Sequence, residues 1–160
     1  MKFKIVLALF GVCLLSGCNG NGRFYPVQGP LSMQAPPPIF AAKAAGFFKS
    51  GSITVFLNDG EVCKGPWKSI TQLPAPTTGT AAAALPPADL SAAWDAVYGP
   101  GFYTAHILGR TQGFHAQSAL TGNKGTTLQV DLFRPVEPGN ATEIRGVAKD
   151  NKGNIYKVVF

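Results

Sequence analysis

Acidic residues, histidines and recognisable catalytic motifs are all scarce in this chain of 160 residues. Eight residues are Asp or Glu and two are His, against 14 Lys and Arg. Acid–base, metal and nucleophilic catalysis require such groups at recognisable spacings. The sequence contains no HExxH, GxSxG, CxxC or P-loop motif. It also lacks heptads, tandem repeats and alternating strand–helix units, which argues against coiled coils, solenoids and parallel α/β folds.

Long hydrophobic runs are missing too, and the uncharged apolar run at the N-terminus is short. Residues 5–15 carry no charge and follow Lys2 and Lys4. As a helix this run would span about 16 Å, roughly half of what a bilayer-spanning helix needs. A short basic start before a short apolar stretch is typical of a secretory signal peptide. We therefore expect residues 1–17 to be a signal peptide, with a buried N-terminal helix or strand as the alternative.

The apolar run ends in Leu15-Ser16-Gly17-Cys18, which resembles the lipobox of bacterial lipoproteins. The resemblance covers residues 1–18. It implies a diacylglyceryl group on the Cys18 thiol, cleavage before Cys18, and acylation of the new amine. Two or three acyl chains, at about 0.8 kcal/mol per buried CH₂, form a stable anchor where a single chain is marginal. Cys18 is therefore the expected lipid attachment site, and a lipid bilayer is an expected partner.

The residues after Cys18 predict both the membrane to which the protein is sorted and a flexible linker. Asn19 follows the modified cysteine, and in the enterobacterial sorting pattern Asn at this place implies export to the outer membrane if the host has two membranes. Gly, Asn and Pro dominate the segment up to Pro38, and such compositions are typical of flexible linkers. We expect residues 18–38 to form the lipidated cysteine and a flexible tether, and the protein to reside in the cell envelope.

Cleavage would leave 143 residues with 12 basic and 8 acidic side chains, a net charge of +4. This length suits one domain. A mildly basic surface is attracted to anionic lipid headgroups or other polyanions, although ordinary solvated strand faces are the alternative. No basic and aromatic side chains cluster in the pattern of a nucleic-acid-binding protein, so we expect no nucleic-acid partner.

Cysteine is scarce as well, with three in the whole chain. Cys13 would leave with the signal peptide and Cys18 would carry lipid, so Cys63 would remain alone and no intramolecular disulfide could form. A lone cysteine is most often a small buried apolar residue, and we expect this for Cys63. Pairing between chains and a reactive thiol are the alternatives.

Alternating apolar residues separated by turn signals predict a mainly β domain over residues 39–160. We expect a small antiparallel meander, closed as a barrel or sandwich so that its edges are shielded. Asp59 and Glu61 lie in a predicted hairpin turn, where solvated carboxylates are the default, and Gly65-Pro66-Trp67 should end the returning strand. The expected strands cover residues 52–58, 61–64, 102–109, 111–120, 126–134, 141–149 and 154–160.

One short helix and one loop interrupt this pattern. Residues 89–98 are predicted to be helical, with Asp89 as a cap. Leu90, Trp94 and Val97 share one face at helical spacing, so we expect this face to dock on the sheet. Residues 73–87 are rich in Pro and Ala and show no apolar period. They predict a long surface loop or a disordered excursion.

The phrases GSITVFLNDGEVCKGPW and RGVAKDNKGNIYKVVF resemble small uncharacterised proteobacterial lipoproteins with β-rich domains. This resemblance implies no activity. His106 and His115, together with Asp95 or Asp131, are the side chains that could form a metal site or a hydrolase-like set. No motif supports such a set, and a histidine on a core or sheet face is the simpler interpretation.

We therefore expect no catalytic residues, no metal and no cofactor. The sequence favours a membrane-anchored envelope lipoprotein that acts as a non-enzymatic binding or structural module, with a ligand or an envelope protein as partner. The alternative is an envelope hydrolase or metal-binding protein that uses His106 and His115. A carboxylate and both histidines converging in one cleft would favour that alternative.

Overall fold

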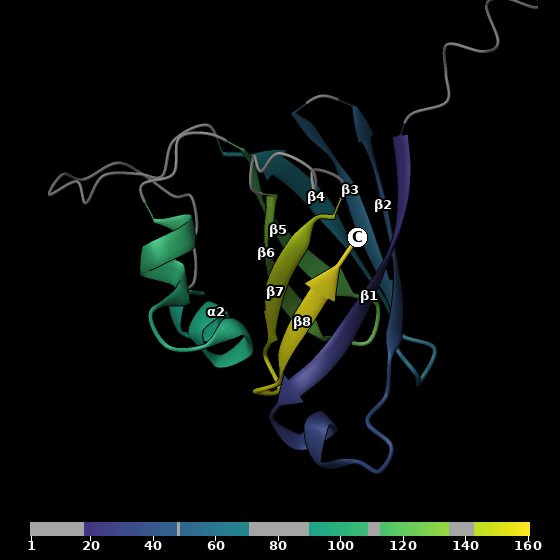
Figure 1. Ribbon diagram of the computed structural model, residues 1–160. Coiled ribbons are helices and arrows are strands. Elements are labelled where there is room, and N and C mark those ends of the chain that lie inside the picture. Colours follow the sequence, from purple (N-terminus) through teal and green to yellow (C-terminus); the bar gives the residue numbers. More distant parts are fainter. Residues whose placement is uncertain (1–17, 48, 71–89, 109–112, 135–142) are drawn as a thin grey trace, which may run out of the picture.

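A computed structural model describes residues 18–47, 49–70, 90–108, 113–134 and 143–160. Eight antiparallel strands form a closed barrel in which each strand pairs with the next and β8 pairs with β1 (Figure 1). The mainly β meander predicted from the sequence is confirmed, and it closes as a barrel. The strands are β1 Cys18–Gln28, β2 Phe40–Phe47, β3 Ser50–Phe56, β4 Val62–Ser69, β5 Phe114–Gly122, β6 Thr127–Arg134, β7 Arg145–Asp150 and β8 Ile155–Val159. The predicted signal peptide, residues 1–17, and the predicted loop, residues 73–87, lie outside the described residues.

Period-two alternation in each strand builds the barrel core. Leu128, Val130 and Leu132 of β6 are buried together with Tyr156 and Val158 of β8. Barrels of eight strands have an interior just wide enough for side chains to fill or for one small ligand to enter. The alternation that predicted the strands therefore also selects the side chains that fill the barrel.

The N-terminal segment is the first departure from the sequence prediction. Residues 18–38 were expected to be a flexible tether, but β1 begins at Cys18 and pairs with β2 from Cys18 opposite Gly46 onward. The tether prediction is therefore wrong for this strand. The physical reason is packing: a Cβ on Gly22 would collide with the Phe160 ring, so this glycine makes room for an aromatic side chain inside the barrel. After β1 a 3-10 helix, η2 (Pro30–Met33), crosses one end of the barrel.

Strand β4 also runs further than expected, because Gly65-Pro66-Trp67 does not end it. The pairing with β5 runs up to Lys64, skips Gly65 and Pro66, and resumes at Trp67. The Ser118 hydroxyl donates to the Pro66 carbonyl at 2.8 Å. The missing N–H of proline thus falls where the ladder is already interrupted, an arrangement that lets a strand contain proline.

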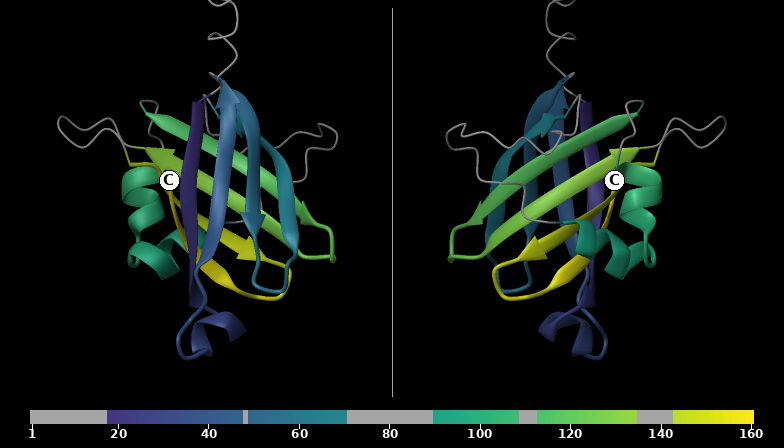
Figure 2. Two further views of the ribbon diagram at one scale, coloured as in Figure 1. Left: turned by 90° about the vertical axis from the view of Figure 1, so that its right-hand side faces the viewer. Right: turned by 90° about the vertical axis from the view of Figure 1, so that its left-hand side faces the viewer.

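The predicted helix is confirmed as α2 (Ser91–Tyr98), which lies outside the barrel against β7 and β8 (Figures 1 and 2). Asp89 lies outside the described residues. Trp94 is buried, but in an outer cluster with Leu90, Phe133 and Val147 rather than in the barrel core. None of the described helices is long and apolar enough to cross a membrane.

The strand predicted over residues 102–109 is wrong. Tyr103–Ile107 form a single π-helical segment, η3, which also packs outside the barrel. Trp94, Tyr98, Phe102 and His106 recur every four residues, and their neighbouring rings lie 5.3, 4.8 and 4.6 Å apart between centroids. This spacing continues across the Gly99-Pro100-Gly101 break. The packing of Phe102, Tyr103 and Ile107 against Phe133 and Val147 of the barrel wall outweighs the two-residue alternation of this segment.

Candidate functional site

A cavity of about 300 Å³ lies at the end of the barrel that η2 covers. Its apolar surface comes from Leu31 of η2, Phe40 of β2, Leu57 after β3, and Tyr156 of β8. Ligand sites are usually concave and mostly apolar, with a few polar groups that fix the orientation of the ligand. Gln34 after η2 is polar, and the other polar residues come from the tight turns between strands: Asn58, Asp59, Thr126, Asp150, Lys152 and Asn154.

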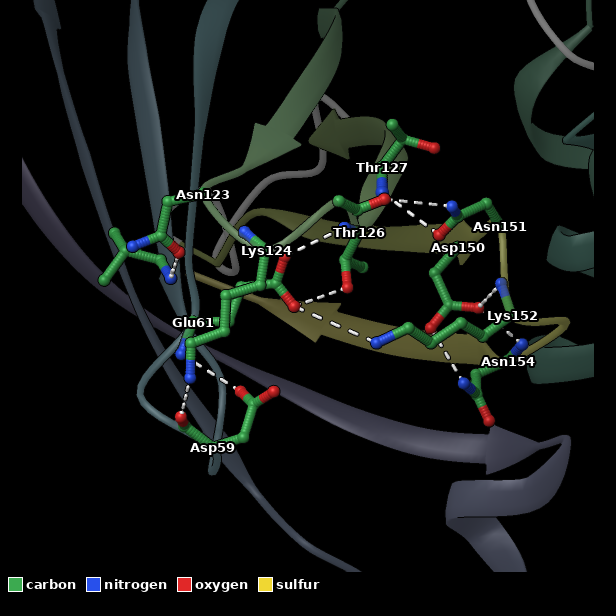
Figure 3. Close-up of polar contacts among 12 residues, drawn as sticks. Asp59, Glu61, Asn123, Lys124, Thr126, Thr127, Asp150, Asn151, Lys152 and Asn154 are labelled. Carbon is green, nitrogen blue, oxygen red and sulfur yellow. Dashed lines mark hydrogen bonds and ion pairs between the residues drawn. The ribbon is translucent and has the colours of Figure 1, made fainter.

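Glu61 organises the turns beside this cavity (Figure 3). It is 1% exposed, which corrects the expectation of a solvated turn carboxylate. Its Oε1 accepts hydrogen bonds from the backbone N–H groups of Lys124 (3.1 Å) and Thr126 (2.8 Å), and its Oε2 accepts one from the Thr126 hydroxyl at 2.5 Å. The β3–β4 and β5–β6 hairpins are joined by these contacts. The sequence contained a sign of this burial. Glu61 is two residues before Cys63, so the two side chains point to the same, inward side of the strand.

The pKa of the Glu61 carboxyl lies below its ordinary value. The largest cause is the hydrogen bond from the Thr126 hydroxyl. Burial acts in the opposite direction, and the backbone N–H groups of Thr126 and Lys124 and the charge of Lys152 lower the pKa further. Glu61 is therefore held as a carboxylate.

Asp150 is the second buried carboxylate of this end. Its Oδ1 accepts from the backbone N–H groups of Lys152 (2.9 Å) and Asn154 (2.8 Å). Its Oδ2 accepts from the Asn154 side-chain amide (2.8 Å) and the Tyr156 hydroxyl (2.7 Å). Burial, followed by this hydrogen bond to Asp150, raises the pKa of Tyr156. Four bonds use the acceptor capacity of a carboxylate, so Asp150 is a structural group.

The same hydrogen-bond network positions η2, which covers the cavity. The side-chain oxygen of Asn154 accepts a hydrogen bond from the backbone N–H of Leu31 at 2.9 Å, which ties η2 to the β7–β8 hairpin. Leu31 then lies over the apolar side of the cavity. The cavity is thus formed by a fixed contact between the first and the last hairpins of the chain.

Two lysines supply positive charge near the mouth. Lys152 lies 3.8 Å from the Glu61 carboxylate and its side chain is 57% exposed. The Lys124 ammonium donates to the carbonyl of Asp59 and is also exposed. Because the two buried carboxylates already accept several hydrogen bonds, the exposed charged groups of the lining that can meet a polar part of a ligand are Lys152, which would attract an anion, and Asp59, which would attract a cation.

The two histidines, together with Asp95 and Asp131, lie away from this cavity. His115 Nε2 is 2.5 Å from Asp131 Oδ1, and the Trp94 indole N–H donates to Asp131 Oδ2 at 3.1 Å. Both His115 and Asp131 are buried on the outer side of the barrel. Asp131 therefore anchors α2 to the barrel wall through Trp94. Asp95 accepts from the backbone N–H of Tyr103 at 3.0 Å.

His106 does not join the pair of His115 and Asp131 in any contact of the described residues. It is exposed, and its ring is tilted by 34° against the Phe102 ring, with the centroids 4.6 Å apart. Among residues 18–47, 49–70, 90–108, 113–134 and 143–160, no group of three or more His, Cys, Asp or Glu is placed to hold a metal ion.

The structure describes the side chain of Cys63 but not that of Cys18. Cys63 is fully buried in the barrel core, as predicted. Burial, with a smaller contribution from the negative charge of Glu61, raises the pKa of its thiol to about 11, which disfavours the nucleophilic thiolate. Cys18 is the first residue of β1. Its side chain is outside the described set, and its acylation stays a prediction.

The chain matches no protein-family model, no curated protein and no solved structure at a significant level.

Proposed function

We propose that the chain is a lipid-anchored, non-enzymatic binding barrel of the cell envelope. Its ligand is a small amphiphile with an anionic head, such as a medium-chain fatty acid. The apolar part lies against Leu31, Phe40 and Leu57, and the head points toward Lys152. The observation that carries this proposal is the η2-covered cavity, with an apolar surface and an exposed lysine on its lining.

The anchor rests on Leu15-Ser16-Gly17-Cys18, which resembles a lipobox. Because β1 begins at Cys18, acyl chains on this residue would hold the barrel directly at the membrane surface. The partners of the proposed protein are thus the bilayer, through Cys18, and the ligand of the cavity.

A binding role is favoured over catalysis by the hydrogen bonds at the site. Glu61 and Asp150 are occupied by the turns that they hold together, whereas a general base must reach a proton of the substrate. The alternative of a hydrolase or metal-binding protein has one contact in its favour, between His115 and Asp131. That pair also fixes Trp94 of α2, which is a structural reason for it.

The test is displacement of a fluorescent amphiphile, 1-anilinonaphthalene-8-sulfonate, from the folded full chain by decanoate. We expect the probe to bind, decanoate to displace it, and Leu57→Trp to weaken binding by about tenfold or more, since burial of one apolar side chain contributes about 1.5–3 kcal/mol. The matched control is Phe56→Trp, because Phe56 precedes Leu57 and is 40% exposed.

A second pair of variants tests the position of the head group. Lys152→Gln should weaken decanoate binding a few-fold, whereas Lys149→Gln on the outer face of β7 should leave it unchanged. Thermal unfolding checks that every variant is folded. Equal probe binding by Leu57→Trp and Phe56→Trp would show that the cavity is not the site, and failure of decanoate to displace the probe would reject the proposed ligand class.

A further inference from the structure

The outer wall formed by β1 to β4 carries positive charge and no negative charge. The four strands contain Arg23, Lys43, Lys64 and Lys68, all of them exposed, and no Asp or Glu. The helices α2 and η3 pack around β6 to β8, with a smaller contact between α2 and β1, and no described element covers the outer face of β2 to β4 (Figure 2, left). An unscreened set of like charges on one face attracts an anionic partner.

The register brings these cations together. Lys43 of β2 is paired with Thr54 of β3, and Thr54 is paired with Lys64 of β4, so the two lysines lie in one row, two strand spacings or about 10 Å apart. Arg23 is paired with Ala41, which belongs to the next outward row along β2. Arg23, Lys43 and Lys64 thus form one group on the wall, and Lys68 lies four residues further along β4.

Exposed apolar side chains flank this group on the side of η2. Met33, Ile39, Val27 and Phe56 are 85, 54, 42 and 40% exposed. Phe56 lies in the row of Arg23, through Ala41. The fifth exposed large apolar side chain of the described residues, Leu108, follows η3 instead. Basic and large apolar groups on one face are the combination that binds anionic membrane surfaces.

We propose that the barrel lies on its side on an anionic bilayer, with the wall of β1 to β4 against the lipid. The acyl chains on Cys18 hold one end of β1, the cations meet the headgroups along the wall, and Met33, Ile39, Val27 and Phe56 enter the interface near the other end. The inference rests on the membrane anchorage proposed above for Cys18. Because β1 has 11 residues, the two apolar anchors are separated by roughly 35 Å of strand.

A bilayer fits this wall better than a protein or a nucleic acid does. The cations are spread over an open, curved sheet face rather than lining a groove, and Phe56 beside them lies with aliphatic side chains. Headgroups are a mobile layer of negative charge, and apolar side chains next to the cations can enter the region beneath them. This placement also brings η2, and with it the cavity, close to the lipid from which an amphiphile would enter.

The experiment uses the full chain purified in its acylated form, with acylation verified by mass. An environment-sensitive nitrobenzoxadiazole fluorophore is attached at Phe56→Cys or, as the control, at Leu108→Cys; Cys63 is buried and reacts slowly. The protein is placed on vesicles of phosphatidylethanolamine with phosphatidylglycerol, or of phosphatidylcholine alone. We expect a several-fold rise in emission at position 56 on the anionic vesicles, reversed by high salt, and little change at position 108.

Charge variants test the same surface independently. The pair Lys43→Gln with Lys64→Gln should weaken docking about thirtyfold, from roughly 1 kcal/mol per lysine near an anionic membrane and 1.4 kcal/mol per factor of ten. The matched pair Lys149→Gln with Arg134→Gln, on β7 and β6 across the barrel, should change docking by less than about twofold.

The outcomes separate this inference from the proposed anchorage. Protein without acyl mass would contradict the anchorage, and docking would then be measured on the unacylated chain. Acylated protein whose position 56 stays in water on both vesicles, or whose positions 56 and 108 respond equally, would overturn the docking orientation. Equal docking on anionic and neutral vesicles would overturn the role of the cations.

Discussion

Replacement of Glu61 should loosen the η2 end of the barrel more than replacement of any exposed acid. Glu61→Ala removes the acceptor of three hydrogen bonds, of which two come from Thr126, itself 1% exposed. Each buried donor that is left without a partner costs about 1–3 kcal/mol. We therefore expect the free energy of unfolding to fall by about 2–5 kcal/mol, and the midpoint of thermal unfolding to fall by several to about 15 °C.

Glu61→Gln separates hydrogen bonding from charge. The amide oxygen can accept from the two backbone N–H groups, and the amide nitrogen can donate to the Thr126 hydroxyl, so the loss of stability at neutral pH should be about 1 kcal/mol. Loss of the contact with the exposed Lys152 adds little. Glu143→Gln is the control, because Glu143 pairs with Arg145 at the surface and should contribute no more than about 1 kcal/mol.

The charge of Glu61 should appear in the pH dependence of stability. Its folded-state pKa lies below the ordinary value of 4.5. Its stabilising contribution is therefore fully present above about pH 4.5 and is lost as the pH falls toward the folded-state pKa. The stability difference between the wild type and Glu61→Gln should shrink over this acidic range.

Urea unfolding at neutral pH and at several acidic pH values measures both effects. A Glu61→Ala protein as stable as the Glu143→Gln control would show that the three hydrogen bonds contribute nothing. A wild-type and Glu61→Gln pair with parallel pH profiles would refute the argument that the carboxylate charge is stabilising in the fold.

Three further predictions follow from the cysteines and the last strand. Cys18→Ser should abolish incorporation of labelled palmitate while Cys63→Ala retains it; labelling of the Cys18→Ser protein would refute lipid attachment at this residue. The Cys63 thiol should react with a thiol reagent at least about 100-fold more slowly in the native than in the unfolded chain, because its pKa is raised from 9.0 to about 11 and it is buried; equal rates would contradict its burial. Removal of residues 156–160 should abolish cooperative unfolding, since Tyr156 and Val158 contribute about 1.5–3 kcal/mol each of a total of about 5–15 kcal/mol and their loss opens the barrel; a cooperative transition at the wild-type temperature would show that β8 is dispensable.

Local sequence patterns were sufficient to predict much of the barrel. The apolar alternation of β6 and β8 follows from the two-residue repeat of any strand, and the turn residues 150–153 mark the hairpin between β7 and β8. The burial of Cys63 followed from its place in a short strand. These features depend on neighbours within a few residues, which is why they are visible in the sequence.

The candidate site was hidden because its parts are far apart in the sequence. Glu61 and Thr126 are 65 positions apart, and Leu31 and Asn154 are 123 apart. A carboxylate in a turn is normally solvated, and only the closing of the barrel places the backbone N–H groups of another hairpin around it. The cavity between η2 and the turns exists for the same reason.

The conformations at Gly22, at Pro66 and over residues 103–107 separate what the sequence determined from what the tertiary structure decided. The sequence by itself determined the strand alternation, the hairpin turns and the apolar face of α2, because each follows from residues close together in the chain. Only the tertiary structure decided that Gly22 packs against Phe160 instead of serving a tether, that β4 continues through Pro66, and that residues 103–107 form a helical turn. In each case a distant contact outweighs a local preference of about 1 kcal/mol or less. These contacts are the packing of Phe160 against Gly22, the pairing of β4 with β3 and β5, and the docking of residues 103–107 on the barrel wall.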